Sequence, residues 1–231
     1  MDLDWLNLDW ILQNPYTTIL ILWAIAAFLS KQPGITFFFL ALPLGVVVYL
    51  ITKPALPLIP AGTSVQAINN APEQKKLPND ILFEYHQQHH LRALATYVIT
   101  GRVLTEKPYY GEIASFDLML GWGQLSDPGI ISKLIFSQDN HFYRVSAIVE
   151  GQWPIPEQQV RINSSNNHIL PASFVVESKI EKLRKGQIVS LGGYLVDIED
   201  PKGTHLKTSL TRDDTGSNSS EIFYVQSINA F

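Results

Sequence analysis

The chain carries two long apolar stretches near its N-terminus, TTILILWAIAAFLS at residues 17–30 and GITFFFLALPLGVVVYLIT at residues 34–52. Lys31 is the only formally charged residue within the two stretches or between them. A helix needs about 20 mostly apolar residues to cross about 30 Å of hydrocarbon, and neither stretch has the polar stripe of a surface helix. We therefore expect two transmembrane helices, over about 12–30 and about 35–52.

Pro33 and Gly34 separate the stretches with a turn signal, so residues 1–53 are predicted to form a helical hairpin. The alternative is a pair of core helices in a soluble protein, but two adjacent apolar runs exceed ordinary core-helix lengths. A cleavable signal peptide is not expected, because the first nine residues, MDLDWLNLD, contain no Lys or Arg.

The composition of the 231 residues excludes several classes of protein. The chain is 46% hydrophobic and only 16% charged, with a mean hydropathy of +0.07, which excludes an intrinsically disordered chain. It has no Cys, which removes disulfide scaffolds, thiolate zinc sites, Fe–S clusters and cysteine nucleophiles. The net charge of −4 argues against a nucleic-acid partner that is bound mainly through its phosphates.

Beyond the hairpin, residues 54–79 contain five prolines and are predicted to be an extended linker. Residues 80–231 have the size of one domain, for which the expected class is α+β with a β-rich, OB-like small barrel and short helices. Gly192 and Gly193 are expected to form a bulge or bend. Strands are expected over 96–105, 113–120, 142–149, 159–163, 187–198, 205–211 and 221–228, and helices over 80–95, 127–135 and 173–185.

Polar motifs mark four candidate regions in this domain. His86, His89 and His90 would share a helix face and could bind a metal, although a solvated face is the preferred interpretation. Trp122 lies between two glycines and could form a ligand wall or a core anchor, and Asp127 before Pro128 is expected to cap a helix.

Two later segments are rich in hydroxyl, amide and carboxylate groups: NSSNNHILPA at 163–172, expected to be a polar turn, and SLTRDDTGSNSSE at 209–221. Neither contains a complete catalytic constellation, a nucleophile elbow or an EF-hand spacing. No catalytic residue, metal ligand or cofactor is therefore predicted. The predicted ligand-binding residues are Trp122, Ser165, Asn166, His168, Arg212, Asp213 and Asp214.

Five segments, in order, resemble a family of uncharacterised bacterial membrane-anchored or exported proteins. The segments are LGWGQLSD (120–127), ISKLIFSQDNHFYRV (131–145), SSNNHILPA (164–172), LRKGQIVSLGGYLVDI (183–198) and SLTRDDTG (209–216). The resemblance implies a bacterial envelope setting and no particular activity. The resembling proteins carry a Cys directly before the Glu that opens the last strand, where this chain has Ser220 before Glu221.

These observations lead to one functional expectation and two alternatives. We expect a multi-pass protein of the bacterial inner membrane that presents a binding or scaffolding domain, which the Lys-free N-terminus favours on the outer face. Its partners would be the lipid bilayer and another envelope protein or a small polar ligand. The alternatives are a membrane-anchored hydrolase, using His168 with Ser165 and Asp213 or Asp214, and an accessory subunit of a larger membrane complex.

Overall fold

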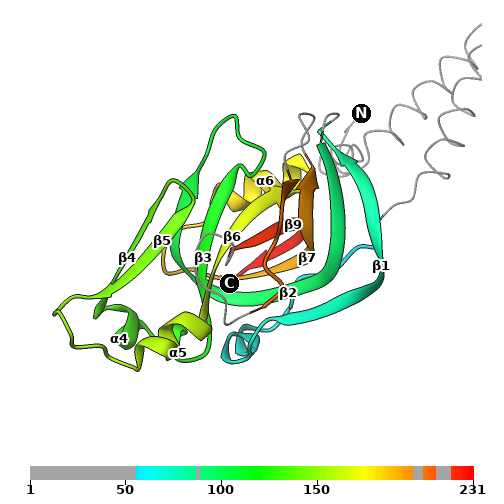
Figure 1. Cartoon of the computed structure of the whole chain (residues 1–231). Coiled ribbons are helices and arrows are strands. Elements are labelled where there is room, and N and C mark those ends of the chain that lie inside the picture. The colour runs from blue at the N-terminus through cyan, green and yellow to red at the C-terminus, as the bar shows by residue number, and fades with distance from the viewer. Residues whose placement is uncertain (1–55, 87–88, 200–204, 212–219) are drawn as a thin grey trace, which may run out of the picture. The chain divides into compact units, whose positions relative to one another are not determined.

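The computed structural model describes residues 56–86, 89–199, 205–211 and 220–231 (Figure 1). The chain divides into two compact units, Met1–Leu56 and Pro57–Phe231. None of the helices within the described residues is long and apolar enough to cross a bilayer. The predicted membrane hairpin, residues 1–53, lies outside the described part of the chain.

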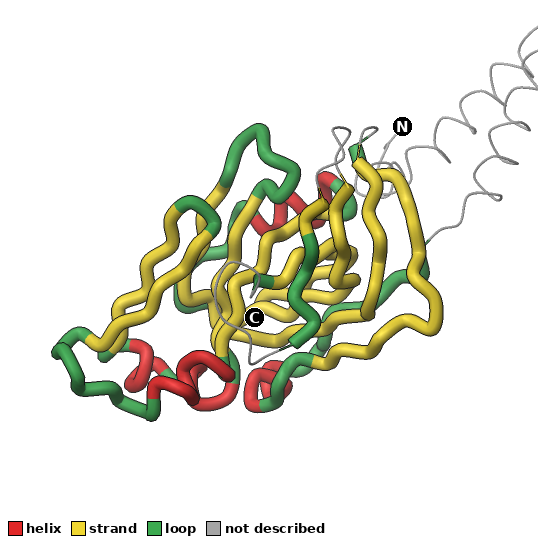
Figure 2. The backbone as a smooth tube through the Cα atoms, in the orientation of Figure 1, coloured by secondary structure: helices red, strands yellow, loops and turns green. Residues whose placement is uncertain are grey.

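The second unit is built on a seven-stranded sheet, most of which closes on itself (Figure 2). Its order is β1-β2-β3-β6-β9-β7-β8, and an additional pairing of β2 with β7 joins five of these strands into a ring. Neighbouring strands are antiparallel except for β6 and β9, which are parallel. The strands are β1 (Glu73–Tyr85), β2 (His89–Pro108), β3 (Phe116–Gly121), β6 (Ser164–Pro171), β7 (Ile188–Glu199), β8 (His205–Leu206) and β9 (Glu221–Ala230).

The ring encloses the main hydrophobic core. Side chains alternate along each strand, and the inward set includes Tyr97, Ile99, Leu118 and Phe223, all fully buried. The rings of Tyr97 and Phe223 meet edge to face at 4.9 Å. These side chains fill the inside of the ring, which is therefore a packed core rather than a channel. Burying each of them stabilises the folded state by about 1.5–3 kcal/mol.

A separate hairpin covers the outer face of β3. It consists of β4 (Leu134–Asp139) and β5 (Phe142–Ala147), which form their own two-stranded sheet beside the ring (Figure 1). A second hydrophobic cluster joins Met119 of β3 to Leu134 and Phe136 of β4. Both faces of β3 are therefore buried. The short helices are η1 (Val65–Asn69), η2 (Gly123–Ser126), α4 (Pro128–Ile131), α5 (Glu157–Ile162) and α6 (Phe174–Ile180).

The prediction of a β-rich domain with short helices is confirmed. The strands expected over 96–105 and 221–228 lie within β2 and β9, and the strand expected over 187–198 lies within β7 except for its first residue. The pairing of β7 with β9 shifts register between Gly192 and Gly193, as a bulge requires. Asp127 caps α4, since its carboxylate accepts hydrogen bonds from the next helical amides.

Other expected elements were wrong. The helix expected over 80–95 is wrong. Its residues up to Tyr85 belong to β1 and those from His89 onward to β2, which pair with each other, because the alternation of Ile81, Phe83 and Tyr85 is a strand pattern. Residues 159–163, expected to be a strand, belong mainly to α5, which an i,i+4 pair between Glu157 and Arg161 supports.

Three further expectations were too long or misplaced. The helix expected over 173–185 ends at Ile180, and the strand expected over 205–211 is limited to β8. The expected polar turn at 163–172 is mostly the buried strand β6, because it pairs on both edges and is covered on both faces.

The linker expected over 54–79 also differs from the structure, because its described residues belong to the β domain. The amide of Ile59 donates to Oε1 of Gln226 at 2.9 Å, and the amide of Gly62 donates to Oγ of Ser190 at 2.7 Å. Residues from Glu73 onward form β1. The segment also contains the short helix η1, and its prolines did not prevent these residues from packing along the sheet, where Pro78 lies in the edge strand β1.

Candidate metal centre

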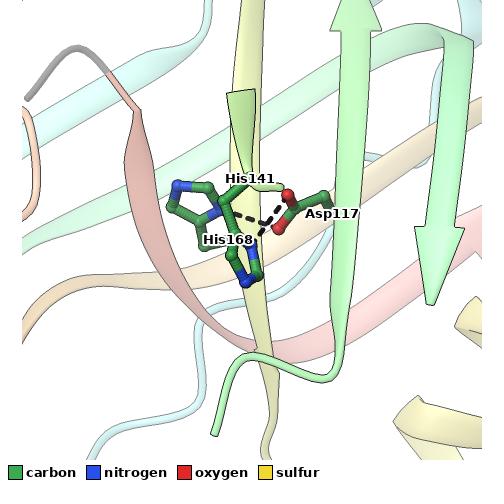
Figure 3. A group of neighbouring side chains, drawn as sticks. All are labelled: Asp117, His141 and His168. Carbon is green, nitrogen blue, oxygen red and sulfur yellow. Dashed lines mark hydrogen bonds and ion pairs between the residues drawn. The ribbon is translucent and has the colours of Figure 1, made fainter. Parts of the chain in front are cut away.

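Asp117 and His168 meet across two neighbouring strands. Asp117 lies in β3 and His168 in β6, where the antiparallel register makes them direct partners. Because Phe116 and Leu118 point into the core, the intervening Asp117 points to the outer face of the ring. Nδ1 of His168 lies 2.6 Å from Oδ1 of Asp117 (Figure 3).

The β4–β5 hairpin brings a second imidazole to the same carboxylate. His141 lies in the turn of this hairpin, and its Nδ1 is 3.0 Å from Oδ2 of Asp117. Each carboxylate oxygen therefore faces one imidazole nitrogen (Figure 3). One potential ligand atom from each of Asp117, His141 and His168 lies within 4.8 Å of the other two.

The backbone at His141 is strained. Asp139 pairs with Phe142, so the turn has two residues, Asn140 and His141, with φ angles of 47° and 64°. A turn with positive φ at both positions favours Asn followed by Gly. For a residue with a full side chain, this left-handed conformation costs about 1–2 kcal/mol. Strain of this kind persists where surrounding contacts enforce it, and it is concentrated at functional sites.

Several contacts hold His141 in this position. Its ring stacks on Tyr109 with centroids 3.9 Å apart, and its backbone amide donates to the Tyr109 hydroxyl at 2.9 Å. Its Nε2 lies 2.6 Å from Oε2 of Glu112. The side-chain amide of Asn166 donates to the carbonyl of His141 at 3.1 Å and accepts from Nε2 of Gln138 at 2.6 Å. The imidazole is thus oriented from three sides.

The donor set and its accessibility fit a transition-metal ion. The Asp117 side chain is 0% exposed, whereas those of His141 and His168 are 30% and 18% exposed, so an ion can enter from the imidazole side. Two imidazoles and one carboxylate are ligands that Zn²⁺ and Fe²⁺ take, with further positions left for water. Ca²⁺ and Mg²⁺ prefer ligand sets made of oxygen.

The structure places the predicted ligand-binding residues in different environments. Trp122 is 2% exposed and belongs to the main core, so it is an anchor and not a ligand wall. Ser165 points away from His168, because residues three apart on a strand face opposite sides, and its Oγ accepts from Nδ2 of Asn167 at 2.9 Å. Among the members of this set that the structure describes, Asn166 and His168 join the cluster, whereas Trp122 and Ser165 do not.

The hydrolase constellation is not brought together in the described residues. Ser165 and His168 face opposite sides of β6, and the carboxylate that contacts His168 is Asp117. Arg212, Asp213 and Asp214 lie outside the described part of the chain. His89 and His90 are consecutive residues of β2 and follow the hairpin turn that contains His86, so the three do not share a helix face.

Two of the three cluster residues were missed by the sequence analysis. Asp117 is a single acid within the apolar run FDLML, and His141 follows Asn140 in the turn of a hairpin. Both features are local signals, but neither identifies its partner, which lies 24 residues away in the chain. No protein-family model, curated protein or solved structure matches this chain, so the geometry carries the functional argument.

Proposed function

We propose that the chain is a membrane-anchored protein of the bacterial cell envelope whose β domain binds one divalent transition-metal ion through Asp117, His141 and His168. The observation that carries this proposal is the buried Asp117 carboxylate held between two imidazole Nδ1 atoms. The proposal retains the expectation of a binding protein and departs from the expectation that it holds no metal.

Burial of the carboxylate supports a bound cation. A charged group removed from water is costly unless it is paired or coordinates a metal. Metal–nitrogen and metal–oxygen bonds of about 2.0–2.2 Å place ligand atoms about 3.3 Å apart in a tetrahedral site. The Nδ1 atoms now lie 3.0 and 2.6 Å from different Asp117 oxygens, and one ligand atom from each of the three residues lies within 4.8 Å of the other two. Shifts of up to about 1.5 Å between ligand atoms would therefore form such a site.

The surroundings of His141 also support metal binding. An imidazole that binds a metal through one nitrogen usually donates its other N–H to a carboxylate or carbonyl, which fixes the ring and its tautomer. Glu112 is placed to accept this hydrogen bond, because its Oε2 lies 2.6 Å from Nε2 of His141.

The proposal also includes a specific architecture for the β domain and for its anchor. Five strands close into a ring in the order β2-β3-β6-β9-β7, and α6 lies between β6 and β7 in the chain. This arrangement supports a small barrel of the OB type. The apolar runs in residues 1–53 support a two-helix anchor, and the Lys-free N-terminus supports placing the domain on the outer face of the inner membrane.

Alkaline carbonate washing of disrupted cells tests the anchor. We expect the full-length polypeptide to remain in the membrane pellet, because two spans of about 20 apolar residues are held by the hydrocarbon core and not by surface charge. Recovery of the intact polypeptide in the supernatant would contradict the anchor and leave the metal site untouched.

The metal site is tested on the full chain in mild detergent, stripped with a chelator and titrated with Zn²⁺ or Co²⁺. We expect saturation at one ion per chain and a visible Co²⁺ spectrum typical of nitrogen and oxygen ligands. Excess Mg²⁺ or Ca²⁺ should not compete, because these ions favour oxygen ligands. If Zn²⁺ shows no saturable binding, the cluster is a hydrogen-bond network that organises the hairpin, and the proposed function is wrong.

His141→Gly separates a metal-binding role from a structural one. Glycine suits the left-handed turn, which offsets part of the loss of the imidazole's contacts with Asp117, Glu112 and Tyr109. We therefore expect the metal-free variant to fold with a stability lower by about 1–3 kcal/mol. Zinc affinity should fall by about 100-fold or more, because one of three ligands is lost. A variant that is strongly destabilised without metal but still binds zinc would indicate that His141 serves the fold.

A further inference from the structure

A cleft lies next to the metal cluster, with a volume of about 440 Å³. Its walls come mainly from three parts of the domain, namely the end of β1, the β2–β3 connection and the segment from the end of β6 through α6, and Tyr224 of β9 adds to them. Tyr109 and Glu112, which contact His141, also line this cleft. We call it the acidic cleft.

Acidic side chains dominate its charge. Glu84, Glu112, Glu177 and Glu181 line the acidic cleft together with His86, and no Lys or Arg is among the described residues that line it. The four carboxylates come from all three walls, since Glu84 belongs to β1, Glu112 to the β2–β3 connection and the other two to the α6 segment. A concave site lined by carboxylates concentrates the field and attracts cations.

Aromatic rings supply the rest of the lining. Tyr110 and Phe174 are 88% and 73% exposed at the cleft, which is unusual for side chains of this size. Deeper in the cleft, the rings of Tyr85 and Tyr224 meet edge to face at 5.9 Å. The faces of such rings attract ammonium groups within about 6 Å of the ring centre, most strongly where water is excluded.

The phenol groups of the cleft are neutral, and one polar atom of its lining is buried and unpaired within the described part of the chain. The Tyr85 hydroxyl donates to the carbonyl of Pro171 at 3.2 Å. Burial, followed by Tyr224 and the charge of Glu177, raises the pKa of Tyr85, and burial raises the pKa of Tyr224, so both phenols stay protonated. Oγ of Ser115, which also lines the cleft, is buried and has no hydrogen-bond partner among the described residues.

We propose that the acidic cleft binds a small organic ammonium ion, with its cationic nitrogen beside the carboxylates of Glu177 and Glu181, which lie four residues apart on the α6 segment, and its carbon groups against the aromatic rings. This ligand is independent of the metal ion in the proposed function. Carboxylates favour the charge, aromatic faces favour an organic cation over a hydrated metal ion, and the volume suits a small molecule.

Calorimetric titration of the full chain in mild detergent tests the proposal, with chelator present so that no metal contributes. The probes are choline, for a quaternary ammonium, butylammonium, for a primary one, and the uncharged carbon isostere of choline. We expect saturable binding of at least one cation, no binding of the isostere, and affinity that falls as salt is raised. Choline alone would indicate aromatic recognition, and butylammonium alone would indicate hydrogen bonding to the carboxylates.

Matched variants locate the binding. Glu177→Gln combined with Glu181→Gln should weaken binding of the cation by about tenfold or more, since two charge partners are lost while the shape of the side chains is kept. Glu150→Gln, an exposed acid outside the cleft, should change the affinity by less than about twofold. Thermal unfolding of each variant monitors folding.

Two outcomes would overturn the proposal: neither cation binds, or Glu150→Gln weakens binding as much as the double variant does. A zinc titration of the same preparations keeps the two sites apart. Zinc binding with no ammonium binding would remove the acidic cleft and leave the metal site standing, and ammonium binding without zinc binding would do the reverse.

Discussion

Asp117→Asn is expected to lower zinc affinity by about 100-fold or more while the β domain still folds. Asn has the same shape as Asp, but it carries no charge and is a poor ligand for a transition metal. In the metal-free protein, a neutral imidazole can change its tautomer, so that one Nδ1 donates to the Asn oxygen and the other accepts from its NH₂ group. The substitution therefore removes a metal ligand without leaving a buried polar group unpaired.

Thermal unfolding measures how much the loss of zinc affinity lowers the stability that zinc confers. A ligand at 100 times its Kd stabilises the folded state by about 2.7 kcal/mol, which for a domain of this size raises the Tm by about 5–10 °C. At the same free zinc concentration, a variant with 100-fold weaker affinity gains only about 0.4 kcal/mol, or about 1 °C. The measurement is the zinc-dependent shift of the Tm, followed by tryptophan fluorescence of the full chain.

Asp139→Asn is the matched control. Asp139 belongs to the same hairpin, but its side chain is 90% exposed and its partner is Lys107, at 2.7 Å. The hydrogen bond from Lys107 lowers the pKa of the Asp139 carboxyl, so this acid is charged at neutral pH and should not affect zinc. An equal zinc-dependent shift in Asp117→Asn and in the unchanged protein would exclude the Asp117 carboxylate as a ligand.

The parts of the fold that were predictable have local patterns. Thr96–Thr105 and Gln187–Ile198 alternate β-branched and apolar residues, and Asp127-Pro128 is a helix start that needs no distant partner. β6 lacked such a pattern, because Ser164–His168 is a polar run that is buried by strands on both edges and by the hairpin above it. Its burial is a tertiary property.

The candidate site shows the same contrast between local sequence patterns and tertiary contacts. His168 was singled out from its polar segment, but its assumed partners were other residues of local motifs. The actual carboxylate lies 51 residues earlier in the chain, and the second imidazole lies in a turn between them. Strand register brings Asp117 opposite His168, and a single sequence does not contain that register.

Gly193→Ala is expected to prevent stable folding, with a loss of about 3 kcal/mol or more. A Cβ at Gly193 would collide with the backbone carbonyl oxygen of Tyr224 and would lie 3.1 Å from the backbone nitrogen of Gln226. Overpacking usually costs about 1–3 kcal/mol when side chains can move aside. Here the obstacle is the backbone of the paired strand β9, so β7 and β9 would have to separate at the bulge.

Gly151→Ala provides the contrast. A Cβ at Gly151 would meet no atom within 4 Å, but this glycine has a φ of +74°, so only conformational strain of about 1–2 kcal/mol is expected. Comparing the denaturation midpoints of the two variants sets the steric cost at Gly193 against the conformational cost at Gly151. Equal midpoints would mean that β7 and β9 accommodate the added methyl group for no more than about 1–2 kcal/mol.

The consequence of Gly193→Ala extends to the metal cluster. β9 lies between β7 and β6 in the ring, and β6 carries His168 opposite Asp117. A displaced β9 removes the pairing that holds β6, so zinc binding should be lost although no ligand has changed. Gly151→Ala should keep the zinc affinity of the unchanged protein. If Gly193→Ala were unstable and yet bound zinc normally, β3 and the β4–β5 hairpin would position the ligands without the closed ring.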